Sequence, residues 1–435
     1  MQKKQDTYGI VWFTTNLRVQ DNTALYESLH NHDRVVGVYC FDPRQFALNA
    51  YGFKKTEVFR AKFLIESVIN LRNRLEEFNI PLFIYHDTPE NRIPDLVKTL
   101  NAQSIYYQKE WTQEEHDVQK DLVARLPKTV AIKSYFDQFL FHPDDIGIPI
   151  PDIPNVFTNF RKHVEHNVFV RNVLPIPAKH NCNVPNTTAI PTLKDFGFED
   201  FEPHPHTAFP FKGGEDQALE RVQSYFYESK KLGIYKKTRN GLLGTDYSSK
   251  LSPWLALGCI SARTVFWAVK DFEKTNFKNE STYWLFFELI WRDYFKYVSL
   301  KHGNAFFKLG GILNKDYEWN RDWDLINSWI QGTTQAPFVN ANMIELKKTG
   351  WMSNRGRQNV ASYFAKTLEL DWRIGAAYFE SLLIDYDVHS NYGNWMYVAG
   401  VGNDPRDRKF NVRLQAERYD PQGHYQRLWL QNTLF

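Results

Sequence analysis

Glycines, serines and basic residues are concentrated at residues 235–254, which read YKKTRNGLLGTDYSSKLSPW. Pro253 suits the first turn of a helix. Unpaired backbone N–H groups at a helix start favour a phosphate. The hydroxyls of Ser248, Ser249 and Ser252 and the ammonium of Lys250 would add donors. The pattern therefore indicates a phosphate-binding segment, although an ordinary N-cap at Ser252 explains it equally well.

A second group of reactive side chains lies in the run ELIWRDYF at residues 288–295. Glu288 and Arg292 are four residues apart and on a helix could form a surface ion pair worth only a few tenths of a kcal/mol. Trp291, on the adjoining face, is unusual for an exposed helix. The run is therefore compatible with a plain surface pair and with a ligand site.

Two further runs carry amides, arginines and carboxylates, at residues 350–359 and 385–395. The first places three polar side chains on one face of a helix start: Asn354, Arg357 and Gln358. The second places Asp385 and Asp387 ahead of a predicted Asn/Gly-rich turn. Two acids at this spacing do not face each other on a helix, which argues against a glycosidase-like pair. We expect Asp385 to pair with Arg357 and Asp387 to accept hydrogen bonds from a ligand.

The tryptophans are distributed unevenly along the chain. Only Trp12 and Trp111 precede residue 250, and eleven follow it, at positions 254, 267, 284, 291, 319, 323, 329, 351, 372, 395 and 429. A large helical domain could use them as core alone. The same residues could also form stacking platforms for a planar ligand or for nucleobases.

Composition sets limits on the class of protein. The 435 residues are enough for two or three domains, and 43% hydrophobic with 24% charged residues is typical of a soluble globular chain. A net charge of +3 means that any nucleic-acid binding must use a local patch. The three dispersed cysteines fit a reducing compartment and form no metal-ligand pattern. With no membrane-spanning run and too short a polar leader for targeting, we expect a cytoplasmic protein without a membrane partner.

The elements that must position these residues fall into an α/β part followed by a helical part. Strands are expected at 10–13, 34–41, 81–85, 104–107 and 130–132, and helices at 57–79, 89–100 and 112–125. This alternation predicts a doubly wound, parallel-sheet domain over residues 1–140. No GxGxxG follows the first strand, so the usual dinucleotide site is not expected there.

Residues 141–215 form a predicted interdomain connector, because eleven of the chain's twenty prolines lie between 143 and 215. From 216 to 435 the pattern predicts an all-α domain. Its expected helices are 216–230, 252–273, 280–302, 321–331, 338–348, 354–369, 372–383 and 411–417.

Long motifs in this order resemble the photolyase/cryptochrome family. They are SSKLSPWLALG, ELIWRDYF, TGWMSNRGRQNVASYF and DWRIGAAYFESLLIDYDVHSNYGNW followed by VAGVGNDPR. The opening VWFTTNLRVQDNTAL is similar to the family's first strand and helix. VYCFDPRQF and SNRGRQNV resemble the DASH cryptochromes in particular. The resemblance covers most of the chain outside the connector.

The resemblance implies a U-shaped FAD within the helical domain. The pyrophosphate would be held by Tyr235, Ser248, Ser249, Lys250, Leu251 and Ser252. The flavin would be lined by Glu288, Arg292, Trp351, Asn354 and Arg357. Asp385 and Asp387 would meet the isoalloxazine edge and the adenosine part, and Asn391 would face the flavin N5.

It also implies light-driven repair of cyclobutane pyrimidine dimers by electron donation from excited reduced FAD. Glu288 and Asn354 would hydrogen-bond the damaged bases, and Trp291 would stack on them. The family's electron-transfer chain falls on Trp395, Trp372 and Trp319, although each could be a core tryptophan. The alternative is a blue-light photoreceptor that signals through flavin photoreduction.

Two positions depart from the dimer-repairing members of the family. Gln358 and Tyr397 stand where those enzymes usually carry Met and Trp against the extruded lesion. Extracting bases from a duplex costs a few kcal/mol, and aromatic stacking returns about 1–3 kcal/mol per base. A smaller, more polar wall therefore predicts a preference for single-stranded or looped DNA. We also expect the protein to be a monomer.

The DASH group also implies a folate antenna, methenyltetrahydrofolate, on the α/β domain. Glu110 occupies the position of the acidic contact to this antenna. Trp111 and Thr112 depart from the residues usually found beside it, so the remaining contacts are not specified by the resemblance.

Overall fold

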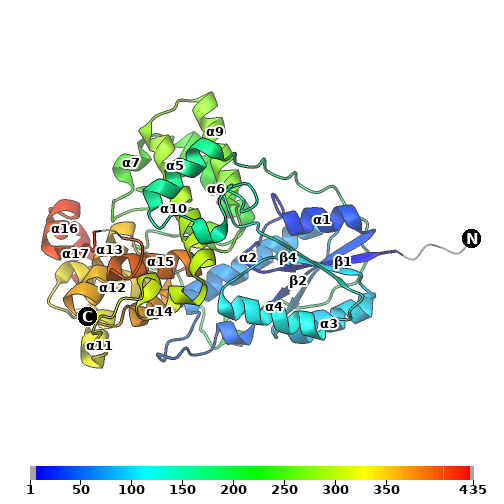
Figure 1. The fold of residues 1–435 in the computed structure, drawn as a ribbon, viewed down its shortest axis with the longest axis horizontal. Coiled ribbons are helices and arrows are strands. Elements are labelled where there is room, and N and C mark those ends of the chain that lie inside the picture. Colours follow the sequence, from blue (N-terminus) through cyan, green and yellow to red (C-terminus); the bar gives the residue numbers. More distant parts are fainter. Residues whose placement is uncertain (1–5, 405, 432–435) are drawn as a thin grey trace, which may run out of the picture.

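A computed structural model describes residues 6–404 and 406–431. The N-terminal part contains a five-stranded, all-parallel sheet in the order β3-β2-β1-β4-β5. The strands are β1 (Tyr8–Phe13), β2 (Arg34–Cys40), β3 (Leu82–Tyr85), β4 (Ser104–Gln108) and β5 (Ala131–Tyr135). Its helices are α1 (Thr23–Asn31), α2 (Val58–Glu77), α3 (Pro89–Leu100) and α4 (Gln113–Arg125). The sheet lies between these helices, with α1 and α2 on one side and α3 and α4 on the other (Figure 1).

The side chains of β1 alternate between two separate cores, which shows why helices cover both faces of the sheet. Val11 and Phe13 are buried in the large core that continues into the helical part. Ile10 and Trp12 are buried in a separate core with residues of α3 and α4. Successive side chains of a strand point to opposite faces, so a run that is apolar throughout requires a layer of helices on each side. The predicted doubly wound fold is confirmed.

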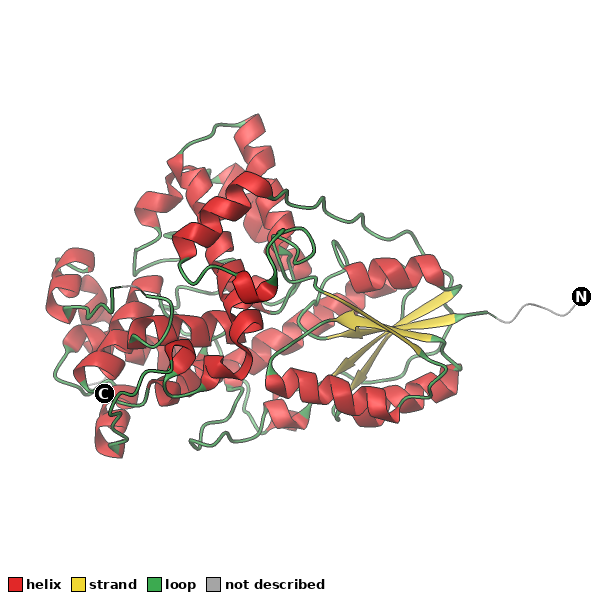
Figure 2. Ribbon diagram, viewed as in Figure 1, coloured by secondary structure: helices red, strands yellow, loops and turns green. Residues whose placement is uncertain are grey.

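The rest of the described chain is helical, as Figure 2 shows. The longest helix is α10 (Glu280–His302), which contacts α5, α7, α9 and α15. The others are α5 (Phe157–Asn167), α6 (Glu215–Val222), α7 (Tyr235–Thr238), α8 (Ser252–Ala256), α9 (Ala262–Thr275), α11 (Trp323–Gln331), α12 (Pro337–Thr349), α13 (Asn354–Ser362), α14 (Trp372–Leu382), α15 (Val388–Ala399), α16 (Val412–Tyr419) and α17 (His424–Leu430).

The helical part corrects the predicted elements at three places. The predicted helix 252–273 is two helices, α8 and α9, because Gly258 turns the chain with φ +65°. A Cβ on Gly258 would lie 2.1 Å from the Thr15 carbonyl oxygen, so only glycine fits this contact with the N-terminal part. Helix α5 forms in the predicted connector, in the proline-free stretch between Pro154 and Pro175. The Asn/Gly-rich turn predicted after Asp387 is instead the helix α15.

A buried network of charges joins the sheet-containing part to the helical part. Arg263 of α9 donates two hydrogen bonds of 2.9 Å to the Asp21 carboxylate and one of 2.7 Å to Asp137. Arg18 donates to the other oxygen of Asp137 at 3.0 Å. All four side chains are at most 5% exposed. Each charge therefore meets an opposite charge at this interface, and the two parts pack as one body.

No described helix is both long enough and apolar enough to cross a bilayer.

Candidate functional site

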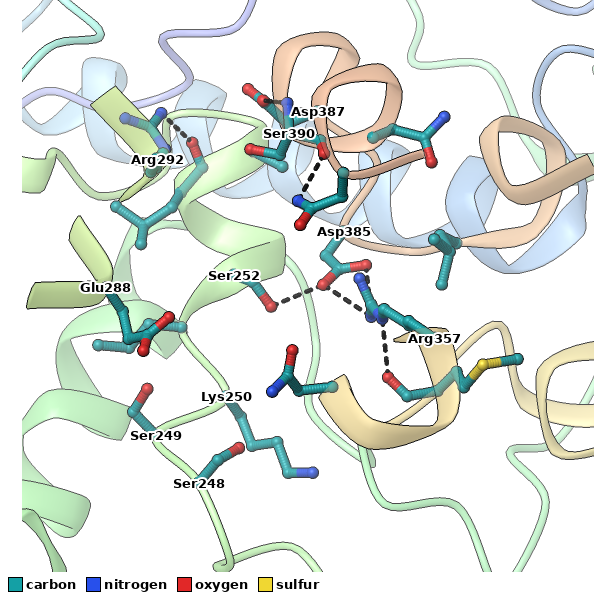
Figure 3. A pocket seen from close by; sticks show the side chains of 18 of the residues that line it. Ser248, Ser249, Lys250, Ser252, Glu288, Arg292, Arg357, Asp385, Asp387 and Ser390 are labelled. Atoms are coloured by element: carbon teal, nitrogen blue, oxygen red, sulfur yellow. Dashed lines mark hydrogen bonds and ion pairs between the residues drawn. The ribbon is translucent and has the colours of Figure 1, made fainter. Parts of the chain in front are cut away.

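The predicted site residues converge on one cavity inside the helical part. The cavity has a volume of about 310 Å³ and lies between α7, the segment 247–252, α10, α13 and α15. Figure 3 shows that the labelled side chains come from segments on different sides of this space. Sixteen of the residues singled out from the sequence line it: Tyr235, Ser248, Ser249, Lys250, Leu251, Ser252, Glu288, Arg292, Trp351, Asn354, Arg357, Gln358, Asp385, Asp387, Asn391 and Trp395.

Lys250 is the least compensated charged group in the lining. Its residue is 2% exposed, and its ammonium has no hydrogen-bond partner within residues 6–404 and 406–431. The Nζ atom lies 3.3 Å from the ring centre of Tyr247 and 4.5 Å from that of Trp351. Burial lowers the pKa of Lys250 well below its usual value. A buried amine that has ring faces beside it but no hydrogen-bond partner among the described residues is expected to gain from an anionic ligand such as a phosphate.

The helix after this segment is shorter than predicted, which changes the physical argument for a phosphate. Helix α8 has five residues, and Leu251 rather than Ser252 occupies its N-cap position. The support for an anion here comes from Lys250 and the serine hydroxyls rather than from the dipole of a long helix. Ser252 already donates a hydrogen bond of 2.7 Å to Asp385.

The predicted pair between Arg357 and Asp385 is present. Arg357 Nη2 lies 2.9 Å from each Asp385 carboxylate oxygen, and its Nε donates to the Met352 carbonyl. Together with Ser252 these contacts tie three segments across the cavity (Figure 3). Asp385 thus has a fixed orientation before any ligand arrives.

Asp387 is held by protein groups as well. Its carboxylate accepts from the backbone N–H of Ser390, which makes it the N-cap of α15, and it pairs with Lys296 at 2.8 Å. Burial alone would raise the pKa of Asp387, but the nearby cations, Lys296 first, hold it below its usual range. Asp387 therefore lines the cavity as a carboxylate already paired on one side.

A second cavity of about 410 Å³ adjoins the first and shares Glu288, Arg292, Asn354 and Gln358 with it. Glu288 pairs with Arg239 at 2.9 Å rather than with Arg292. Arg292 donates instead to the carbonyls of Gln138 and Leu255. The surface ion pair considered from the spacing is therefore replaced by two separate contacts.

Aromatic side chains form one wall of this outer cavity. Trp291 stacks on Phe157 of α5 with ring centres 3.6 Å apart and planes 10° from parallel. Tyr397 meets the Trp291 ring edge-on at 5.9 Å. Gln358 accepts a hydrogen bond of 2.9 Å from Arg355. The wall thus combines a flat indole with the polar Tyr397 and Gln358.

The three tryptophans of the predicted chain lie on segments that contact one another. Trp395 of α15 lines the inner cavity, and a Cβ on Gly375 of α14 would lie 2.3 Å from its ring. Trp372 begins the same helix α14. Trp319 precedes Asn320, whose backbone pairs with the segment directly before Trp372. The arrangement runs from the cavity through α14 toward the loop that contains Trp319.

Glu110 lies apart from both cavities. Its carboxylate accepts hydrogen bonds of 2.8 Å from Thr15 and from Gln108. Burial raises the pKa of Glu110 to about 7. The adjacent Trp111 stacks on His389 with ring centres 4.5 Å apart, so Glu110 lies near the contact between the two parts of the molecule.

Some lining residues were missed by sequence reasoning: Tyr247, Ser390 and Asn394 in the inner cavity, and Arg355 and Asp404 in the outer one. Ser390 and Asn394 are four residues apart, which is a helical spacing. Recognising Asp387 as the N-cap of a helix would have identified them. Phe157, the stacking partner of Trp291, had no such signal, because it belongs to a segment distant in the chain.

Comparison with known proteins identifies the chain. The DNA photolyase family model matches residues 9–180, and the model described as the FAD binding domain of DNA photolyase matches residues 284–433. A Cryptochrome DASH from Gloeobacter violaceus is 48% identical over 428 residues, which is 97% of this chain and 85% of that protein. The chain belongs to the photolyase/cryptochrome family, within its DASH group.

Two further relatives agree with this assignment. Cryptochrome DASH from Synechocystis is 46% identical over 97% of this chain and 87% of that protein. The solved Synechocystis cryptochrome superposes with a TM-score of 0.94 at 45% identity, covering 98% of this chain and 89% of that one. A class III photolyase from Agrobacterium tumefaciens gives a TM-score of 0.83 at 25% identity, with coverages of 99% and 87%. Family membership supports FAD as cofactor and a flavin-based function in blue light.

Proposed function

We propose that the inner cavity holds FAD and that the outer cavity admits two extruded pyrimidines of damaged DNA. The observation that carries this proposal is the adjacency of the two cavities, which share Glu288, Arg292, Asn354 and Gln358. A ligand in one would lie against a ligand in the other. The unpartnered ammonium of Lys250 fits the pyrophosphate of FAD, and Trp351, Arg357 and Asp385 fit the flavin side.

Bound, fully reduced FAD supplies, when excited by blue light, the electron that splits a cyclobutane pyrimidine dimer. The chain contributes positioning. Trp291 offers its indole as a stacking surface, held by Phe157, and Glu288 offers a carboxylate for the base edges. Burial raises the pKa of Glu288, and its contact with Arg239 opposes that shift. Exclusion of water by the aromatic wall strengthens these polar contacts.

We propose single-stranded or looped DNA as the preferred substrate. Tyr397 and Gln358 make the wall of the outer cavity polar, and Arg355 and Arg408 add positive charge to it. Tyr397 and Gln358 offer the extruded bases a smaller stacking surface than the Trp and Met of the dimer-repairing enzymes, so stacking returns less free energy. This smaller return matters most in a duplex, where base pairs must first be opened.

The test is repair of a dimer-containing oligothymidylate by the reduced, illuminated protein, followed by the return of thymine absorbance. The single strand should be repaired about tenfold faster than the same strand in a duplex. Glu288→Gln and Trp291→Phe should slow repair. The control Glu280→Gln changes an exposed residue at the start of the same helix and should not. Equal rates on both substrates would refute the preference; no repair with FAD bound would favour a photoreceptor.

We also propose Glu110 as the acidic contact for a methenyltetrahydrofolate antenna. Its carboxylate lies near the contact between the α/β and helical parts, and its raised pKa makes it a ready proton partner for a pteridine ring. Glu110→Gln should weaken folate retention and reduce repair only at wavelengths that the folate absorbs. Equal retention in the variant would contradict this role.

A further inference from the structure

Tyr392 of α15 lies beside the middle tryptophan of the proposed electron-transfer chain. Its ring centre is 6.2 Å from that of Trp372, with the planes 76° apart. Phe307 covers another side of the phenol ring at 4.9 Å. Helices α14 and α15, which carry Trp372 and Tyr392, pack against each other (Figure 1). A phenol and a tryptophan are therefore in near contact, and Tyr392 lines neither cavity.

The phenol of Tyr392 has a carboxylate as its hydrogen-bond acceptor. Its O–H donates to Glu380 Oε2 at 3.3 Å. Burial raises the pKa of Glu380, which makes this carboxylate a stronger base than one in water. Burial likewise raises the pKa of Tyr392 well above its usual value, so the phenol keeps its proton in the resting protein. Tyr392 is thus a protonated phenol with Trp372 on one side and the base Glu380 as its hydrogen-bond acceptor.

We propose that Tyr392 is a redox-active residue that reduces the Trp372 radical cation and passes its proton to Glu380. The inference rests on the proposed function, because photoexcited oxidised FAD, acting through Trp395, is the oxidant that would leave Trp372 one electron short. One electron moves from the phenol to the indole, the phenol O–H bond breaks, and the proton binds Glu380 Oε2. The products are neutral Trp372, a neutral tyrosyl radical and a protonated Glu380.

The proton transfer explains why such a residue would matter. A phenol that loses its electron and its proton together leaves no positive charge to attract the electron back. Return of the electron then requires return of the proton from Glu380. The charge-separated state should therefore live longer than one that ends on a tryptophan, and it should live longer still in heavy water.

A second tyrosine provides a matched control. Tyr317 lies 5.8 Å from Trp319 and its O–H donates to Asp407 at 3.3 Å. Two cations oppose its oxidation: Lys315 donates to its oxygen at 3.0 Å, and Lys366 lies 5.2 Å from its ring centre. Positive charge beside a ring raises the energy of an electron-deficient state there. Arg373 also acts on Tyr392, but its guanidinium is paired with Asp371, whereas Lys315 donates directly to the oxygen of Tyr317. For this reason we assign the role to Tyr392 rather than to Tyr317.

The experiment is electron paramagnetic resonance with transient absorption on the illuminated protein containing oxidised FAD, using ring-deuterated tyrosine to identify the radical. The wild type should show a tyrosyl radical. Tyr392→Phe keeps the ring against Trp372 and Phe307 and should lose the signal, with a radical lifetime shortened about tenfold. Glu380→Gln keeps an acceptor but not a base, and should shorten the lifetime too. Tyr317→Phe should change neither.

The outcomes separate the inference from the function on which it rests. A tyrosyl signal that persists in Tyr392→Phe, or that disappears in Tyr317→Phe, would overturn the inference. So would tryptophan radicals without any tyrosyl in the wild type, which would leave the tryptophan chain intact. Trp372→Phe should abolish the tyrosyl signal, and an unchanged yield would show that Tyr392 is not oxidised through Trp372. No radical of either kind, with FAD bound, would refute the chain itself.

Discussion

Two buried polar regions of this molecule differ in how their charges are compensated. At the interface between the α/β and helical parts, Arg18 and Arg263 meet Asp21 and Asp137 within 3.0 Å. In the inner cavity, Lys250 has no hydrogen-bond partner although it is 2% exposed. Folding removes charged groups from water in both regions, which costs desolvation free energy. Only at the interface do ion pairs within the protein offset that cost.

The difference separates structural from ligand-binding polarity. A closed network stabilises one packing of two domains and has no donor to offer. An open one keeps a donor whose partner must come from elsewhere, and here that donor lines the inner cavity. Burial and charge are common to both regions, so neither alone marks a site. Unsatisfied hydrogen-bonding capacity at a cavity wall does.

The largest expected effect comes from opening the closed network. Asp137→Asn keeps the side-chain shape but leaves Arg18 without a carboxylate partner and Arg263 with only that of Asp21. Removing one partner of a buried charge pair costs about 3–5 kcal/mol. Urea denaturation should show this loss in the free energy of unfolding. A loss below about 1 kcal/mol would mean that water enters the interface and replaces the missing charge.

A pH-dependent effect should come from Glu345, a buried carboxyl group that interacts electrostatically with Lys250. Burial raises the pKa of Glu345 to about 7, against an unperturbed value of 4.5. The folded state therefore binds a proton that the unfolded state releases above pH 4.5. Stability from this group is present below pH 4.5 and is lost as the pH rises to 7, by up to about 3 kcal/mol.

Glu345→Gln checks this sign, because an amide keeps the hydrogen bond to Tyr425 and does not titrate. In FAD-free protein, the unfolding free energy of the wild type should fall relative to the variant between pH 4.5 and 7. Parallel curves would show that Glu345 is ionised in the folded state throughout this range.

Lys250→Met tests the open region directly. The variant removes a buried, unpartnered ammonium and retains the apolar stem, so FAD-free protein should be as stable as the wild type or more so. Its affinity for FAD should fall about 10- to 100-fold, equivalent to about 1.4–2.8 kcal/mol. Lys237→Met, at an exposed position outside the cavity lining, is the control and should bind FAD normally. Unchanged affinity in Lys250→Met would place the pyrophosphate elsewhere.

The sequence predicted the sheet well because its strands are apolar on both faces and short. It predicted α15 wrongly because glycine and asparagine were taken as turn residues. Gly393 is instead a packing residue: a Cβ there would lie 2.3 Å from the Phe295 ring of α10. Gly375 has the same role against Trp395. Tertiary packing thus selected glycine within helices, a choice that local propensity alone disfavours.

The site residues that motifs could indicate are those with neighbours close in the chain. Arg357 and Asp385 lie in two motif runs separated mainly by helix α14; they were paired from that spacing, and the structure contains the pair. The partners of Glu288 and Trp291 could not be predicted: Arg239 belongs to the segment before α8, and Phe157 to the connector. Only the folded chain brings these pairs together, because each joins elements that are distant in sequence.

The smallest expected effect comes from an exposed ion pair, which serves as a reference for the two buried charged regions. Arg413 and Glu417 of α16 form an ion pair at 3.4 Å with side chains 85% and 58% exposed. Water screens such a pair, and ordering two long side chains offsets the Coulombic gain. Arg413→Gln should leave the free energy of unfolding unchanged within measurement error, and FAD affinity with it. A loss comparable to that in Asp137→Asn would mean that charge pairing itself, rather than burial, stabilises the interface.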